Sequence, residues 1–186
     1  MPDERCYCQK RMSQEKGLNT ALIRAYLGLG SNLGDRQHNL SRAIELLSQR
    51  LHVERISSIY ETEPMGYQEQ PRFLNAICQV ATLLSPEKLL ALAKEIEEAL
   101  GRVPSFQNGP RSIDVDILFY GEQVIDNPQL TIPHPRLEER AFVLVPLAEI
   151  APELVHPVSG KTVGEMVQNV GGLGGVKKYN QETKDV

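Results

Sequence analysis

GPRSIDVDILFY, the stretch from Gly109 to Tyr120, places two aspartates at alternate positions of an otherwise apolar segment. Side chains alternate between the faces of a strand, so one predicted face carries Ile113, Val115, Ile117 and Phe119, and the other carries Ser112, Asp114, Asp116 and Leu118. The Cα atoms of the two aspartates should lie about 6.6 Å apart, two strand rises. Carboxylates this close repel, and a bound cation relieves the repulsion. The pattern fits either a solvated outer face or a shared cation.

The residues before this stretch contain further predicted elements. Strands are predicted at 21–29, 53–64 and 73–84, and Leu40, Ala43, Ile44 and Leu47 recur at the spacing of a helix that ends near Leu51. A second helix has clear boundaries, because Ser85 can cap its N-terminus, Pro86 suits its first position, and Gly101 follows its end.

The order strand, helix, strand, strand, helix, strand predicts an α+β fold. It is typical of a ferredoxin-like βαββαβ sandwich, with a mainly antiparallel sheet and the helices on one face. The apolar side of the aspartate strand should meet the helices, which leaves Asp114 and Asp116 on the open face. We expect a flexible leader at residues 1–20, one domain at 21–165 and a mobile C-terminal tail at 166–186.

The composition restricts the class of protein. The net charge of −4 argues against a broad nucleic-acid surface. The N-terminus lacks the apolar region of a signal peptide, and no apolar run approaches the length of a membrane span, so we expect a cytoplasmic protein without a membrane partner. Cys6, Cys8 and Cys78 are an odd number without zinc-ligand spacing, which predicts reduced thiols.

Two polar features allow more than one interpretation. Gly28, Gly30 and Gly34 do not match the dinucleotide fingerprint, so they either form a turn or let a ligand approach the backbone. Asn75 lies inside a predicted strand, where its amide is satisfied by solvent or backbone, or else binds a flat heterocycle.

Positive charge collects around the aspartate strand. The residues concerned are Arg102, Arg111, Arg136 and Arg140, with His134 in the segment IPHPR. Each arginine alone fits a solvated surface residue. Together, arginines beside two carboxylates fit a triphosphate site in which Mg²⁺ lies between the acids and the phosphates.

The chain from about Ala25 to His156 resembles 6-hydroxymethyl-7,8-dihydropterin pyrophosphokinase, an enzyme family of folate biosynthesis. The resemblance rests on these segments, in this order: GLGSNLGD, SSIYETEPMG, QPRFLNA, GPRSIDVDILFYG and LTIPHPRLEERAFVLVPLAEIAPE. It implies a ferredoxin-like fold, two Mg²⁺ ions, and transfer of pyrophosphate from ATP to the hydroxymethyl group of the pterin with release of AMP.

The resemblance also implies roles for individual residues. Asp114 and Asp116 would bind Mg²⁺, and Arg102 and Arg111 would join them as catalytic residues. The pterin would contact Asn75 at its edge, the backbone at Thr62 and Met65, and the rings of Phe73 and Phe142. ATP would be surrounded by Glu97, Arg102, Arg111, Thr131, His134 and Arg140.

One position departs from the family pattern, because Asn108 stands where an aromatic lid residue is common, and Phe106 is a candidate substitute. We expect ATP and a reduced hydroxymethylpterin as partners, no nucleic acid, and a monomer or weak oligomer. Two alternatives stay open: a kinase that transfers the γ-phosphate, and a ferredoxin-like module that binds a ligand without chemistry.

Overall fold

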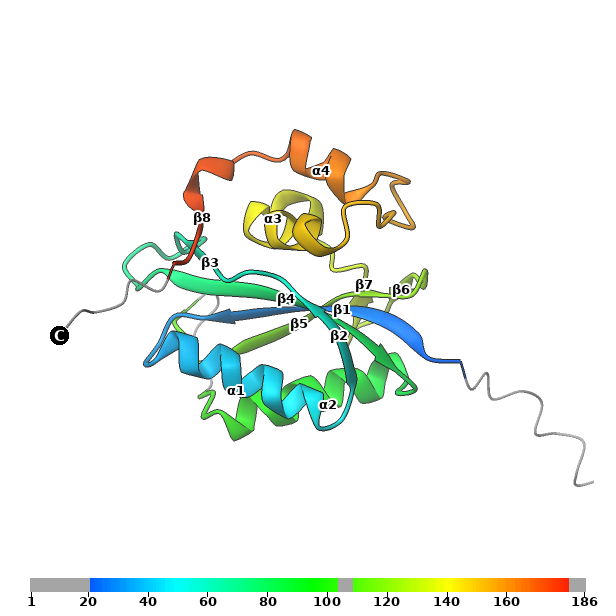
Figure 1. Cartoon of the computed structure of the whole chain (residues 1–186), viewed down its shortest axis with the longest axis horizontal. Coiled ribbons are helices and arrows are strands. Elements are labelled where there is room, and N and C mark those ends of the chain that lie inside the picture. The colour runs from blue at the N-terminus through cyan, green and yellow to red at the C-terminus, as the bar shows by residue number, and fades with distance from the viewer. Residues whose placement is uncertain (1–20, 104–108, 181–186) are drawn as a thin grey trace, which may run out of the picture.

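The computed structural model describes residues 21–103 and 109–180, which form a sheet with helices on both faces. Six strands make an antiparallel sheet in the order β5-β1-β4-β3-β8, with β2 also paired to β4. Figure 1 shows α1 and α2 below this sheet and α3 and α4 above it. The strand order and the first two helices confirm the ferredoxin-like fold, while α3 and α4 add a layer on the face that was expected to be open.

In chain order, the first elements are β1 (Ile23–Ser31), α1 (Arg36–Ser48), β2 (His52–Ile56), β3 (Tyr60–Thr62), β4 (Phe73–Thr82), α2 (Pro86–Ala99) and β5 (Asp114–Tyr120). The remaining elements are β6 (Ile125–Asp126), β7 (Thr131–Ile132), η2 (Leu137–Glu139), α3 (Ala141–Ile150), α4 (Val163–Asn169), η3 (Leu173–Gly175) and β8 (Val176–Lys178).

Helix α2 begins and ends where the sequence predicted. The Ser85 side chain accepts a hydrogen bond from the amide of Lys88, Pro86 occupies the first turn, and Gly101 adopts a positive φ of 73° just past the end. These contacts satisfy backbone groups that a helix terminus leaves without intrahelical partners.

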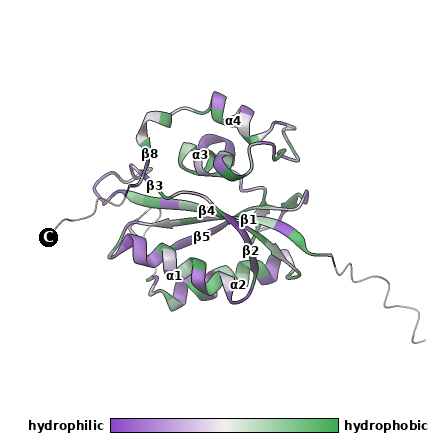
Figure 2. Ribbon diagram, in the orientation of Figure 1, coloured by the Kyte–Doolittle hydropathy of each residue, from purple (hydrophilic) through white to green (hydrophobic). Residues whose placement is uncertain are grey.

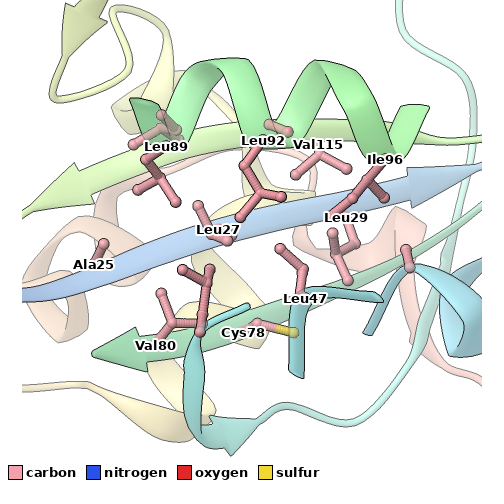
Figure 3. Packing of buried hydrophobic residues seen from close by; sticks show 14 of the residues in the cluster. Ala25, Leu27, Leu29, Leu47, Cys78, Val80, Leu89, Leu92, Ile96 and Val115 are labelled. Carbon is pink, nitrogen blue, oxygen red and sulfur yellow. The ribbon is translucent and has the colours of Figure 1, made fainter. Parts of the chain in front are cut away.

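The larger apolar core lies between the sheet and the pair α1 and α2. Figure 3 shows side chains of β1, β4 and β5, among them Leu27, Cys78 and Val115, directed toward helix residues such as Leu47 and Leu92. Burial raises the pKa of the Cys78 thiol to about 12, so this cysteine is a reduced core residue.

A second apolar cluster fills the other face, between the sheet and α3. Leu144 and Leu147 of α3 are fully buried against Ile77 of β4 and Leu118 of β5. The residues of α3 are mostly apolar, as its sequence AFVLVPLAEI shows, and Figure 2 colours the ribbon by this property; such a composition fits its place between the sheet and α4. Within residues 21–103 and 109–180, no helix is long and apolar enough to cross a membrane.

The predicted alternation along β5 is correct up to Leu118 and wrong beyond it. Leu27 pairs with Ile117 but its neighbour Tyr26 pairs with Phe119, so Leu118 is an extra residue in the ladder. This β-bulge turns Phe119 into the cluster between the sheet and α3, and Tyr120 into the core between the sheet and the pair α1 and α2.

The predicted strand at 53–64 is interrupted. Residues 57–59 separate β2 from β3, and the Ser57 hydroxyl accepts a hydrogen bond of 2.9 Å from the amide of Ile77. A serine side chain therefore replaces a backbone carbonyl in the ladder, which the alternation of residue types does not reveal.

Part of the predicted C-terminal tail is ordered. Residues 166–178 contain the end of α4, η3 and β8, and β8 pairs with β3 through Tyr60 and Lys178, Glu61 and Lys177, and Thr62 and Val176. The predicted tail therefore contributes an edge strand to the main sheet. The predicted leader at 1–20 and the last residues of the tail, 181–186, lie outside the described residues.

Candidate active site

A cavity opens on the face of the sheet that α3 partly covers. The predicted site residues that line it are Thr62, Met65, Phe73, Asn75, Arg111, Asp114, Asp116, Arg140 and Phe142. The other lining residues are Gly28, Leu29, Gly30, Glu63, Gly66, Ala76, Ile77, Leu118, Arg136 and Val143. Four strands and the start of α3 thus contribute to one cavity.

Two glycines of β1 form its floor. Gly30 pairs with Asp114 on one side and Asn75 on the other, and Gly28 pairs in the same way with Asp116 and Ile77. A Cβ atom at Gly30 would lie 3.1 Å from Oδ1 of Asn75. The glycines therefore keep the floor flat and allow a ligand close to the backbone, which favours the second interpretation of this motif.

The third glycine of the motif has a different position. Gly34 has a φ of 66° and immediately precedes Asp35, whose side chain caps α1 by accepting a hydrogen bond from the amide of His38. Gly34 thus makes the turn into the helix.

The two aspartates of β5 face the cavity from the same side, as predicted. Asp114 accepts a hydrogen bond of 3.0 Å from Arg111 and forms an ion pair of 2.7 Å with Arg102. Asp116 lies 3.8 Å from Nη1 of Arg140. Burial, followed by repulsion from Asp114, raises the pKa of Asp116 to about 6. The acids are thus held at a cost that a bound cation would relieve.

Glu97 and Arg102 lie behind the acid pair. The Glu97 side chain is 3% exposed, contacts Arg102, and accepts hydrogen bonds of 2.9 Å from the Val115 amide and from Lys94. These contacts fix the start of β5 and direct Arg102 toward Asp114. Neither Glu97 nor Arg102 is among the described residues that line the cavity.

An aromatic ring stands on each side of the cavity. Phe73 begins β4, and Phe142 lies in the first turn of α3. The guanidinium carbon of Arg111 is 5.5 Å from the centre of the Phe73 ring, and that of Arg140 is 5.7 Å from the centre of the Phe142 ring. Both rings therefore make cation–π contacts with arginines.

Asn75 projects from the middle of β4. Its amide nitrogen donates a hydrogen bond of 2.7 Å to the hydroxyl of Thr62 in β3, and both residues are buried. The amide is therefore oriented by a side chain, and its oxygen faces the floor at Gly30. An oriented amide offers a fixed pattern of donor and acceptor to a flat heterocycle.

His134 lies next to the cavity and Thr131 farther away. The Nε2 atom of His134 is 3.3 Å from Nη1 of Arg140, and burial together with that arginine lowers the pKa of His134 to about 4. Thr131 belongs to β7, which pairs with β6 in a separate sheet. Neither residue is among the described residues that line the cavity, and their assignment to ATP stays a prediction.

Several site residues were not singled out from the sequence. Glu63, Gly66, Leu118 and Val143 line the cavity, and Arg136 joins them from the predicted arginine group. These residues are recognised because the fold brings their chain segments together, and a single sequence does not show which segments meet.

Asn32 was also missed, although it connects three segments around the cavity. It is 1% exposed, accepts a hydrogen bond of 2.8 Å from the Arg111 amide, and donates to Gln70 and to the Pro71 carbonyl at 2.9 and 3.0 Å. The β1–α1 turn, the loop before β4 and the segment before β5 are thereby joined.

The residues present fit Mg²⁺ together with a polyphosphate. Among the described residues, no group of three or more His, Cys, Asp and Glu side chains is arranged around a metal position. The candidate metal ligands from the protein are therefore the two aspartates, Asp114 and Asp116. Mg²⁺ commonly uses one or two carboxylates and completes its shell with water and phosphate oxygens. Nε of Arg111, a residue that lines the cavity, is buried without a hydrogen-bond partner in the described part of the chain, so this guanidinium retains a free donor.

A comparison with protein-family models shows which family the chain belongs to. Residues 26–152 match the model of 7,8-dihydro-6-hydroxymethylpterin-pyrophosphokinase (HPPK). The chain belongs to the HPPK family. The match spans the sheet from β1 to β5, the cavity and α3, and it confirms the resemblance found in the sequence motifs.

Curated relatives carry names from the same family. A 2-amino-4-hydroxy-6-hydroxymethyldihydropteridine pyrophosphokinase from Aquifex aeolicus is 45% identical, with 75% of this chain and 88% of the relative covered. Its counterpart from Bacillus subtilis is 48% identical over 70% of this chain and 79% of the relative. The folic acid synthesis protein fol1 of Pneumocystis carinii is 47% identical over 78% of this chain, but this chain spans 20% of its length.

Solved structures show the same fold. A Plasmodium falciparum HPPK-DHPS structure superposes with a TM-score of 0.69 at 18% identity, covering 82% of this chain and 46% of that one. This chain therefore spans less than half of these larger proteins and corresponds to their HPPK part in fold.

Proposed function

We propose that this chain transfers pyrophosphate from ATP to the hydroxymethyl group of 6-hydroxymethyl-7,8-dihydropterin and releases AMP, a step of folate biosynthesis. The observation that carries the proposal is the joint presence, in one cavity, of the acid pair, three arginines and two aromatic rings beside a buried amide. The names of relatives at 45 and 48% identity support it.

The aromatic side of the cavity suits a pterin. Phe73 and Phe142 offer faces for stacking a flat ring, and Asn75 offers its oriented amide to the ring edge. Thr62 holds that amide, and the backbone near Met65 closes the rim. Glycine at positions 28 and 30 leaves room for the hydroxymethyl group above the floor.

The acidic side suits the triphosphate. Asp114 and Asp116 would hold two Mg²⁺ ions, which supply neutralisation of the phosphate charge. Arg111 and Arg140 line the cavity and Arg102 lies behind Asp114, so their guanidinium groups can bind phosphate oxygens as the charge shifts during transfer. Glu97 keeps Arg102 in place. His134 stays neutral beside Arg140 and leaves the positive potential there to the arginine.

In the chemical step the pterin hydroxyl oxygen attacks the β-phosphorus in line. The bond between that phosphorus and the oxygen bridging to the α-phosphate breaks, AMP departs with the bridging oxygen, and the hydroxyl proton passes to solvent. The residues position both substrates and stabilise charge, which accounts for most of the catalysis in phosphoryl transfer.

Two alternatives predict other products. A kinase that transfers the γ-phosphate would release ADP, and a binding module would leave ATP intact. The acid pair at the end of an aromatic cavity favours an enzyme over a module that uses a sheet face to bind RNA. We also propose a cytoplasmic protein that acts as a monomer or weak oligomer, consistent with its composition.

Nucleotide analysis tests the assignment. Incubation with ATP, Mg²⁺ and the reduced hydroxymethylpterin should yield AMP in step with pterin consumption. Asp114→Asn and Asp116→Asn should each lower the rate by at least about 100-fold, the scale for loss of a catalytic electrostatic group. Asp126→Asn, an exposed change in β6, is the matched control and should retain the rate. ADP as the stoichiometric product, or a fully active Asp114→Asn, would overturn the assignment.

A further inference from the structure

Two arginines each make the same pair of contacts, one with an aspartate and one with an aromatic ring. Arg111 donates to Asp114 at 3.0 Å while its guanidinium lies over Phe73. Arg140 stands 3.8 Å from Asp116 while its guanidinium lies over Phe142. Each of these two arginines thus connects an acid to an aromatic ring.

We propose that Arg111 and Arg140 are exchangeable cations, which occupy the carboxylates and cover the rings until a polyphosphate draws them away. This inference rests on the proposed function, because it assigns the acids to a divalent cation and the rings to a flat heterocycle. The new element is that each arginine controls access of the cation to one aspartate and of the heterocycle to one ring.

The balance of charge between the acids and the arginines supports the exchange. A divalent cation that approaches Asp114 and Asp116 without a polyphosphate meets guanidinium groups already paired with those acids. It must displace them or accept their repulsion, and either lowers its affinity. Arg102, at 2.7 Å from Asp114, adds to this competition.

A polyphosphate changes the balance because it offers the arginines new anionic partners. Guanidinium forks bind phosphate oxygens at least as well as carboxylates, and Nε of Arg111 is buried without a partner among the described residues. Once the arginines turn to phosphate, the acids are free for the cation and the ring faces are free for stacking. Cation and polyphosphate should therefore strengthen each other's binding, and the coupling must be reciprocal.

Removal of an arginine should then have two opposite effects. Arg140→Ala deletes the cation beside Asp116, so binding of a divalent ion without nucleotide should become about tenfold tighter or more, as loss of a nearby positive charge predicts. The same change removes a phosphate ligand, so a non-hydrolysable ATP analogue should bind more weakly. A residue that only maintained the fold would weaken both.

Mn²⁺ binding followed by electron paramagnetic resonance provides the test, with no turnover required. Wild type, Arg140→Ala and Arg140→Lys are titrated with Mn²⁺ alone and with α,β-methylene-ATP. Arg140→Lys keeps the charge and should keep the weak affinity for Mn²⁺ alone. Arg42→Ala is the matched control, since Arg42 pairs with Glu45 on the exposed surface of α1. Arg111→Ala serves as a second variant if Arg140→Ala does not fold.

The outcomes separate this inference from the enzymatic assignment. The exchange is supported if Arg140→Ala binds Mn²⁺ alone more tightly than the wild type while Arg42→Ala binds it with the affinity of the wild type. Unchanged or weaker binding overturns it, even if the wild type releases AMP. If the alanine variant binds Mn²⁺ more tightly but the wild type releases no AMP, the exchange stands and the pyrophosphokinase assignment falls.

Discussion

The side-chain amide of Asn75 donates a hydrogen bond of 2.7 Å to the hydroxyl of Thr62, across the pairing of β4 with β3. Both residues are buried, with exposed fractions of 6% and 5%. Water therefore has little access to this bond, and the orientation of the amide depends on one threonine hydroxyl.

Replacement of that hydroxyl by a methyl group tests this dependence. Thr62→Val leaves a buried donor of Asn75 without its acceptor, which should lower the free energy of unfolding by about 1–3 kcal/mol. It should also weaken pterin binding, measured by calorimetry with an ATP analogue present. Thr62→Ser retains the hydroxyl and should stay close to wild type. Equal pterin affinity in both variants would show that Thr62 does not orient the amide.

The connections of Asn32 predict selective loosening of loops. Asn32→Asp keeps the oxygen that accepts from the Arg111 amide but loses the donor to Gln70 and to the Pro71 carbonyl. Amide hydrogen exchange should therefore accelerate around residues 67–71 and change little at Arg111. Asn32→Ala should accelerate exchange in both segments. Identical exchange profiles for the two variants would contradict this division of roles.

The neutral state of His134 predicts a pH dependence of stability. Its pKa is lowered to about 4 in the folded protein, so between about pH 6.5 and 4 the unfolded chain binds more protons at this residue. Stability from His134 is complete above pH 6.5 and is lost as the pH falls through this window. At pH 5 the loss should be about 1–2 kcal/mol.

Urea denaturation at pH 7 and pH 5 measures this effect by comparing wild type with His134→Gln, which cannot titrate. The variant should lose less stability on acidification than the wild type. Asp116 contributes with the opposite sign, because its raised pKa stabilises the fold as the pH falls, and it does so in both proteins. An equal loss in wild type and variant would show that His134 is not held neutral.

Glu149 connects α3 to the sheet, and its contribution to stability can be measured. Its carboxylate accepts hydrogen bonds from the amide and hydroxyl of Ser58 and from the hydroxyl of Tyr60, at 2.7–3.0 Å. Glu149→Ala should cost about 1–2 kcal/mol in the urea-unfolding free energy, less than a buried charged bond because the site is partly exposed. Tyr60→Phe removes one of the three bonds and should cost less. A larger loss in Tyr60→Phe would refute this account.

The sequence was sufficient where short-range rules decide the structure. The Ser85 cap, Pro86 and Gly101 delimit α2 because each acts on its own backbone. The common face of Asp114 and Asp116 follows from strand alternation alone, and the cavity contains both. The roles carried over from the family to individual residues stay predictions, and Asn108 and Phe106 lie outside the described residues.

Sequence reasoning failed where distant segments decide the outcome. The bulge at Leu118 arises from the pairing of β5 with β1, and nothing within β5 signals that Phe119 changes face. Helix α3 was not predicted because ten mostly apolar residues with Pro146 inside fit no amphipathic pattern, yet burial between sheet and α4 favours such a composition. Asn32 became recognisable only after its three loops were seen to meet.

The pairing of β8 with β3 has a consequence for the newly synthesised chain. Tyr60 and Lys178 lie more than one hundred positions apart, and Thr62, which orients the amide of Asn75, pairs with Val176. On the ribosome the segment around residues 60–62 emerges long before residues 176–178, so that edge stays unpaired until these residues emerge. Contacts this distant form slowly, and an open edge strand invites pairing with other chains. The growing polypeptide should therefore be most prone to aggregation shortly before its last strand appears.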